Sequence, residues 1–188
     1  MAIILTSASR PDPADERIRE YKGVFFNDAT ALISTTVSSG GALGARTVTV
    51  ASTTGFTNTS AISIAGGGNA GGTVPLETFI TATPSGGVLT FRDKVLQTAG
   101  LTAGATVQQM LKLSMPIRPR KLKLLNLTDG VTWEWFDGMV RSSAVKTVWS
   151  TGVTTLETSG GPLVMSDGVW LPQSLMSTSK TFAFEAEA

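Results

Sequence analysis

Leu124-Leu-Asn-Leu-Thr-Asp-Gly-Val-Thr-Trp-Glu-Trp-Phe136 is the stretch of the chain that decides its fold. Thr128-Asp-Gly130 is a turn sequence, because Asp bonds nearby backbone and Gly accepts the backbone angles of tight turns. The residues after it, Val131–Phe136, alternate in polarity with the period of a half-buried strand. This alternation places both tryptophans on one face and Glu134 on the opposite face. The stretch therefore predicts an antiparallel hairpin with its tryptophans in the core and its glutamate in solvent.

Short segments of the same kind recur along the chain, separated by Asp-Gly, Gly-Gly and Pro turns at a spacing of roughly 8–12 residues. These segments are 46–50, 61–64, 77–83, 88–91, 105–108, 120–125, 144–149, 154–157, 162–165, 169–171 and 180–185. Pro84-Ser-Gly-Gly87 and Ser166-Asp-Gly168 predict two further hairpins. No segment after residue 22 shows the period of a long helix. The fold class is therefore mostly β, with one or two small antiparallel sandwich or barrel modules.

The chain divides by composition into three parts. Residues 1–43 are expected to form an extended N-terminal arm, in which Ala14–Lys22 makes a short helix that begins after Pro13. Residues 44–110 are expected to form a small β module, and residues 111–188 a C-terminal β-sandwich module. Whether these two modules are separate domains stays open at this point. The arm should be dispensable for folding, so removal of its first 28 residues should leave a folded body.

Charged residues make up only 15% of the chain, whereas hydrophobic residues make up 41%. An ordinary soluble domain carries about 25% charged residues. Between Ala29 and Leu76 the only charged residue is Arg46. This composition favours a protein whose surface is covered by partners or by neighbouring copies of itself. The alternative is a Thr- and Ser-rich domain whose hydroxyl groups contact the solvent.

The residue types that carry most enzyme chemistry are missing, since the chain has no His and no Cys. This excludes disulfides and thiolate metal sites, and it removes the commonest general base. Gly66-Gly-Gly-Asn-Ala-Gly71 matches a dinucleotide-binding pattern, but no helix is expected after it to bind a phosphate. Ser177-Thr-Ser-Lys180 has the spacing of a Ser–Lys pair without its partner motifs. We therefore expect no enzyme activity, no catalytic residue and no cofactor or metal.

Two features are candidates for protein docking. Val24-Phe25-Phe26 is an apolar tip in the expected arm. The second feature is a stretch from Lys94 to Thr128 that contains basic residues and no acid, and its candidate docking residues are Arg118, Arg120, Lys121 and Lys123. Such a cluster could dock an acidic protein surface or a nucleic-acid backbone. It is also what an ordinary exposed strand face looks like, in which Lys protects a sheet edge.

The remaining partner classes are limited by charge and hydropathy. A net charge of +1 gives no overall attraction to nucleic acid, so no direct nucleic-acid partner is expected. No apolar run approaches the roughly 18 residues of a membrane helix, and Met1–Leu5 is too short for a signal sequence. We expect the protein to be made and kept in a cytosol.

Several segments resemble structural proteins of tailed-bacteriophage virions. The resemblance is carried by Arg46–Phe56, Ile62–Ile64, Leu124–Phe136, Gly138–Met139 and Phe182–Ala186. It implies a decoration (cement) protein that binds the major capsid protein on the capsid surface and bridges neighbouring subunits. It also implies many copies per virion, in contact with one another as a homo-oligomer or as neighbours. A tail or baseplate component and a carbohydrate-binding virion module are the alternatives, the latter because of the four tryptophans.

Overall fold

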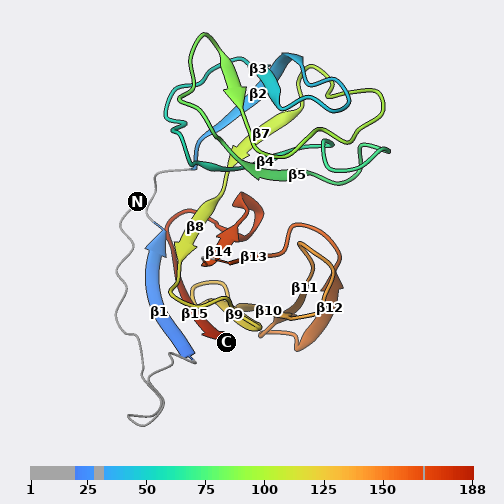
Figure 1. Ribbon diagram of the computed structural model, residues 1–188. Coiled ribbons are helices and arrows are strands. Elements are labelled where there is room, and N and C mark those ends of the chain that lie inside the picture. The colour runs from blue at the N-terminus through green and yellow to red at the C-terminus, as the bar shows by residue number, and fades with distance from the viewer. Residues whose placement is uncertain (1–19, 28–31, 167) are drawn as a thin grey trace. The chain divides into compact units, whose positions relative to one another are not determined.

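The computed structural model describes residues 20–27, 32–166 and 168–188 (Figure 1). The chain divides into two compact units. Unit 1 contains the described residues up to 27 together with 112–188, and unit 2 contains residues 32–111. Unit 2 is therefore an insertion in unit 1. The chain begins unit 1, builds all of unit 2, and then returns to finish unit 1.

Unit 1 consists of a six-stranded sheet in the order β1-β15-β9-β10-β11-β12 and a three-stranded sheet in the order β13-β14-β8. Its strands are β1 (Glu20–Asn27), β8 (Leu111–Ser114), β9 (Lys121–Asn126), β10 (Val131–Phe136), β11 (Ala144–Val148), β12 (Val153–Glu157), β13 (Leu163–Met165), β14 (Gly168–Leu171) and β15 (Lys180–Glu187). A single 3-10 turn, η1 (Gln173–Leu175), precedes β15 among the described residues.

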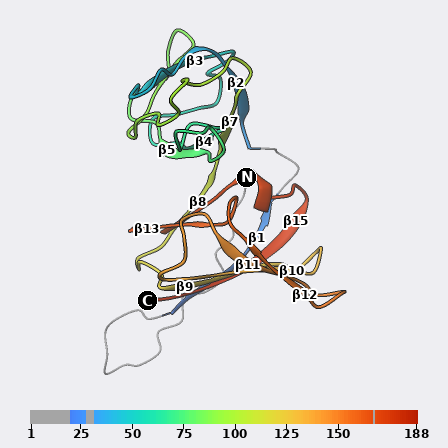
Figure 2. The ribbon, with the colours of Figure 1, turned by 90° about the vertical axis from the view of Figure 1, so that its right-hand side faces the viewer.

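One face of the six-stranded sheet carries the core of unit 1, and we call it the inner face. It is lined by buried aromatic and leucine side chains, namely Phe25, Leu122, Leu124, Trp133, Trp135, Phe182 and Phe184. Phe25 stacks on Phe182, with ring centroids 5.3 Å apart. Two views at right angles show the three-stranded sheet on this side, so unit 1 is a two-layer sandwich (Figures 1 and 2). Both predicted tryptophan positions are thus confirmed as core, while Glu134 lies on the other face.

The three-stranded sheet depends on a close backbone approach at Gly168. A Cβ atom on this residue would lie 2.0 Å from the carbonyl oxygen of Leu113, and its φ of +137° is one that L side chains rarely adopt. Only glycine fits such a position, because any side chain would overlap the neighbouring strand. Gly168, predicted from the sequence as a turn residue, therefore also allows β14 to lie close against β8.

Unit 2 contains a six-stranded sheet in the order β5-β4-β7-β2-β3-β6. Its strands are β2 (Ser34–Gly40), β3 (Thr47–Val50), β4 (Ala61–Ile64), β5 (Leu76–Phe79), β6 (Val88–Thr90) and β7 (Thr106–Gln109). The two ends of this sheet meet just beyond β5 and β6, where Ile80 forms a bridge with Phe91. The sheet consequently curls toward a barrel around its own core, which includes Ile62, Leu89 and Val107.

The predicted mostly β class is confirmed, and every short segment that the sequence predicts as a strand contains one in the structure. The hairpin at Ser166–Gly168 is present as β13 and β14. At the hairpin predicted around Pro84–Gly87, Ser85 bridges Val88 and the amide of Thr81 donates to the carbonyl of Thr90.

The expected N-terminal arm differs from the structure. Glu20–Asn27 is strand β1 and pairs with β15 along its whole length, and Ser34–Gly40 is strand β2 of unit 2. The sandwich module therefore takes in β1, and the small module begins at residue 32 rather than 44. The predicted helix over 14–22 fails at residues 20–22, which are extended, and its other residues lie outside the described part of the chain. The charged residues of β1, Glu20 and Lys22, are compatible with a helical pattern in the sequence. In the structure they alternate with residues that face the core, as in a strand.

No helix in the described part of the chain is both long enough and apolar enough to cross a membrane.

Candidate docking surface

The face of the six-stranded sheet opposite the core, here called the outer face, carries an uncharged row that crosses all six strands. Strand register places one residue from each strand side by side in this row. The members of this uncharged stripe are Val24, Ala183, Leu125, Thr132, Thr147 and Thr154. Phe26 lies beside it on β1 and is 47% exposed, and Leu127 follows β9 and is 43% exposed. The stripe is therefore an uncharged row of aliphatic and threonine side chains, flanked by two exposed apolar residues.

A charged row runs parallel to the uncharged stripe. It alternates in sign from strand to strand, through Lys22, Glu185, Lys123 and Glu134. The ammonium of Lys22 lies 3.6 Å from Glu185 and 2.7 Å from Glu20. The hydrogen bond to Glu20 raises the pKa of Lys22, although partial desolvation opposes this. Because neighbours neutralise one another, the row has little net field to attract a charged partner.

The predicted basic cluster is neutralised in the same way. Lys121 lies 3.3 Å from Glu187, and Arg120 lies 3.6 Å from Asp137. Lys123 is the residue between two glutamates in the charged row. The stretch is free of acids along the sequence, but β10 and β15 bring glutamates to both sides of β9. Arg118, the remaining predicted residue, is exposed and precedes β9.

The apolar tip predicted at Val24–Phe26 is divided by strand alternation. Val24 and Phe26 are 39% and 47% exposed and lie on the outer face, whereas Phe25 is 1% exposed. Phe25 is therefore a core residue rather than a docking residue. Its ring packs between β1 and β15, close to Phe182 and Phe184. Of the predicted docking residues, the structure brings Val24, Phe26, Lys121 and Lys123 onto one face.

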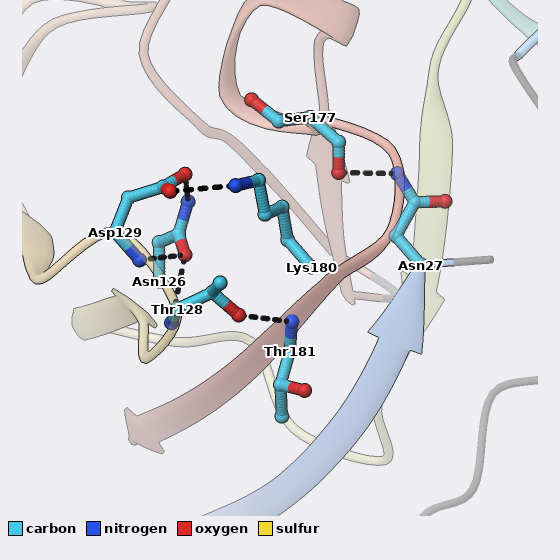
Figure 3. Close-up of polar contacts among 7 residues, drawn as sticks. All are labelled: Asn27, Asn126, Thr128, Asp129, Ser177, Lys180 and Thr181. Carbon is cyan, nitrogen blue, oxygen red and sulfur yellow. Dashed lines mark hydrogen bonds and ion pairs between the residues drawn. The ribbon is translucent and has the colours of Figure 1, made fainter. Parts of the chain in front are cut away.

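The turn between β9 and β10 holds this face together at one end (Figure 3). The side-chain oxygen of Asn126 accepts hydrogen bonds from the backbone amides of Thr128 and Asp129. Lys180 pairs with Asp129 at 2.7 Å, and the hydroxyl of Thr128 accepts a bond from the amide of Thr181. The hydrogen bond from Lys180, followed by that from Asn126, lowers the pKa of Asp129. The network thereby fixes the register of β15 against β9.

A second set of contacts ties β1 to the segment before β15. The side-chain amide of Asn27, at the end of β1, donates to the carbonyl oxygen of Met176. It also donates to the carbonyl oxygen of Ser177 (Figure 3). Ser177 and Lys180, the pair with Ser-x-x-Lys spacing, thus contact different structural partners. The ammonium of Lys180 faces a carboxylate, and Ser177 accepts a bond through its backbone.

Trp149 and Trp170 are the two tryptophans that the sequence alone did not assign to the core or to the surface. Trp149 lies between β11 and β12 and is 47% exposed. Its indole nitrogen donates to the hydroxyl of Thr132 at 2.7 Å, which places the ring over the uncharged stripe. Gly130 provides the space for this, since a Cβ there would lie 3.4 Å from the ring. Trp149 therefore adds an exposed aromatic surface to the outer face.

Strand β12 forms one edge of the six-stranded sheet, and its residues are exposed on both faces. Val153 is 53% exposed and Leu156 is 63% exposed. Its one charged residue, Glu157, is paired at 3.0 Å with Lys146 of the neighbouring strand. Sheet edges of soluble proteins are usually protected by Lys, Pro, bulges or covering loops. Residues 153–156 have no charge or Pro, so this edge is open for strand addition.

The glycine motif at 66–71 is a loop of turns followed by an extended segment, as the sequence predicts. The side chain of Asn69 accepts bonds from the amides of Thr73 and Val74, so the loop closes on itself. In the described part of the chain, no group of three or more acidic, His or Cys residues is arranged to bind a metal ion.

Comparisons of the chain with protein-family models, with curated proteins and with solved structures give no match. The class of the protein therefore rests on its fold and its surface. It is a mostly β protein with a sandwich unit and an inserted, curled β unit. Its most distinctive surface is the outer face of the sandwich, with the uncharged stripe and the open edge at β12.

Proposed function

We propose that this chain is a non-enzymatic structural protein of a tailed-phage virion, and that it binds and stabilises the major capsid lattice as a decoration protein. The observation that carries the proposal is the uncharged stripe on the outer face, which is bordered by the exposed side chains of Phe26, Leu127 and Trp149. Exposed apolar patches on folded proteins are characteristic of protein interfaces. A row that spans six strands presents a broad surface, which suits a protein that bridges neighbouring subunits of a shell.

The chemistry of the outer face suits a partner that is itself largely uncharged. The charged row is internally neutralised, so binding through this face should depend only weakly on salt. A basic dock for an acidic partner would instead lose affinity steeply as ionic strength rises. The predicted docking residues are accordingly reassigned. Val24 and Phe26 are contact residues, whereas Lys121 and Lys123 are neutralised by neighbouring glutamates and lie beside the contact surface.

Co-sedimentation with assembled capsid shells tests the proposal. The wild-type chain should pellet with shells at micromolar concentration and should not bind free capsid subunits. The double variant Val24→Lys/Phe26→Lys should remain in the supernatant, because it places charge on the uncharged stripe. The matched control is Val88→Lys, an equally exposed valine on β6 of unit 2. Absence of wild-type binding, or binding unchanged in the double variant, contradicts the proposal.

A tail or baseplate component is the second candidate, and the open edge at β12 favours it. Lateral strand addition is a means of building rings and tubes from identical subunits. Negative-stain images of the purified protein separate the two candidates, since rings or tubes support the tail assignment.

A carbohydrate-binding virion module is the third candidate, and only Trp149 favours it, because the other three tryptophans are buried. Glycan-array binding that disappears in Trp149→Ala would support this candidate. The same substitution at Trp135 is uninformative for binding, because it removes a core side chain.

A further inference from the structure

We infer that β12 is the contact through which two copies of this chain associate, with the two β12 strands paired antiparallel across a two-fold axis centred on Thr155. The six-stranded sheets of both copies then join into one continuous sheet. This inference concerns self-association and does not depend on the proposed function. It starts from the open edge at β12, where four consecutive residues are exposed on both faces of the sheet.

The register follows from strand geometry. A two-fold axis that makes neighbouring strands antiparallel stands perpendicular to the sheet, so both outer faces lie on the same side. Directly opposed residues must then belong to the same face, since side chains alternate along a strand. The register that satisfies this rule and pairs all five residues of β12 is centred on Thr155. It places Thr154 opposite Leu156 of the second copy, and Val153 opposite Glu157.

The pairs made in this register are compatible with each other. Thr155 faces Thr155 of the second copy, and threonine pairs are among the favourable cross-strand contacts. The two exposed Leu156 side chains become diagonal neighbours on the outer face. No like charges are opposed, because Glu157 meets a valine and is already paired with Lys146 of its own chain. The sequence of β12 is therefore complementary to itself in both charge and hydropathy.

This self-complementarity favours a second copy of the chain over an unrelated strand as the partner of β12. An uncharged edge with no protecting Lys or Pro could pair with many strands, but a second copy is present wherever the protein is made. On the outer face this register places Thr154, at the end of the uncharged stripe, opposite the uncharged Leu156 of the second copy.

Cysteine cross-linking provides the sharpest test, because the natural chain has no Cys. Opposed residues of an antiparallel pair have Cα atoms about 4.5–5.5 Å apart, which suits a disulfide. Under mild oxidation the full-length Thr155→Cys protein should form a covalent dimer in high yield. Val153→Cys should cross-link poorly, because residue 153 opposes residue 157 rather than itself. Thr102→Cys, an exposed site in unit 2, is the control for random collisions.

Charge substitutions provide an independent measurement by analytical ultracentrifugation. Wild type should show a concentration-dependent dimer. Thr155→Lys and Thr155→Asp should each dimerise about tenfold or more weakly, because like charges are opposed at the axis. An equimolar mixture of the two variants should recover the dimer, and Thr102→Lys should behave as wild type. A monomeric wild type, equal cross-linking of Val153→Cys and Thr155→Cys, or no recovery in the mixture would overturn the inference. Circular dichroism of each variant verifies that it is folded.

Discussion

The two units contain sheets with the same number of strands, but the sheets end differently. In unit 2 the ends meet at Ile80 and Phe91, and the sheet curls around its own core. In unit 1 the sheet is open, its inner face is covered by a second layer, and β12 remains as an exposed edge. A sheet that closes satisfies its backbone internally, whereas an open sheet presents donors and acceptors to another chain. The contrast places an open sheet edge in unit 1.

The largest expected effect comes from Gly168→Ala, which tests whether each unit has a core of its own. The new methyl group would overlap the carbonyl of Leu113, so β14 must separate from β8. We expect unit 1 to lose more than about 4 kcal/mol of stability, which is in the range of the most severe single substitutions. Hydrogen exchange followed by mass spectrometry should show lost protection in unit 1 and retained protection in residues 32–111.

Gly138→Ala is the matched control for this substitution. Gly138 also has a positive φ, of 94°, but a Cβ there has nothing within 4 Å. Its cost should be limited to backbone strain of about 1 kcal/mol. Equal effects of the two substitutions would mean that the close approach at Gly168 is unimportant. Loss of protection in both units after Gly168→Ala would mean that the two cores do not fold separately.

The next effect concerns β1, and it compares two adjacent phenylalanines. Phe25→Ala should destabilise unit 1 by about 3–5 kcal/mol, because it leaves a cavity beside Phe182. Phe26→Ala should change stability by about 0.5 kcal/mol or less, because that ring faces solvent on the outer face. Urea unfolding of both variants measures the difference. Similar values would place residues 20–27 outside the sheet and restore the interpretation of this segment as a separate arm.

Removal of residues 1–28 follows from the same comparison. The sequence suggested that this truncation would leave a folded body, but it deletes β1, the partner of β15 along eight residues. We now expect the truncated protein to lose the cooperative unfolding of unit 1.

The smallest effect is a pH dependence at the β9–β10 turn. Asp129 has a folded pKa below its ordinary value near 3.8, so its pairing stabilises the protein fully above that pH. The stabilisation is lost as pH falls through the folded pKa. Asp129→Asn should therefore melt slightly below wild type at pH 6, and the difference in melting temperature should begin to shrink only as pH falls below about 4, toward the lowered folded pKa. A constant difference down to pH 2.5 would contradict the assignment.

Local pattern was enough to predict the strands that are joined by short turns. The hairpin of β9 and β10 shows this, because Thr128-Asp-Gly130 and the alternation around it lie within one stretch. Strand β1 was not predicted, because its pairing partner β15 is more than 100 residues away in the sequence and no local turn connects the two strands. Its charges, Glu20 and Lys22, suggested a helix, although Lys22 belongs to the charged row that only the assembled sheet creates and Glu20 forms an ion pair with it.

The docking surface was predictable only in part for the same reason. Val24, Phe25 and Phe26 were all identified as an apolar tip, but which of the three side chains face outward depends on pairing with β15. The lysines of β9 were identified as a basic stretch, and the glutamates that neutralise them come from strands before and after it in the sheet. Trp149 could not be distinguished from Trp170, which is buried, since exposure depends on which strand lies at an uncovered edge.

The position of unit 2 as an insertion has a consequence for biosynthesis. Its strands are all made before β8, so unit 2 can fold while the chain is still on the ribosome. Strand β1 is made before unit 2, but its partner β15 is made only after it. Until then Phe25 lacks its contact with Phe182, and the slow step of folding is the pairing of these two strands, which lie far apart in the sequence. A nascent copy in this state is a candidate substrate for chaperones.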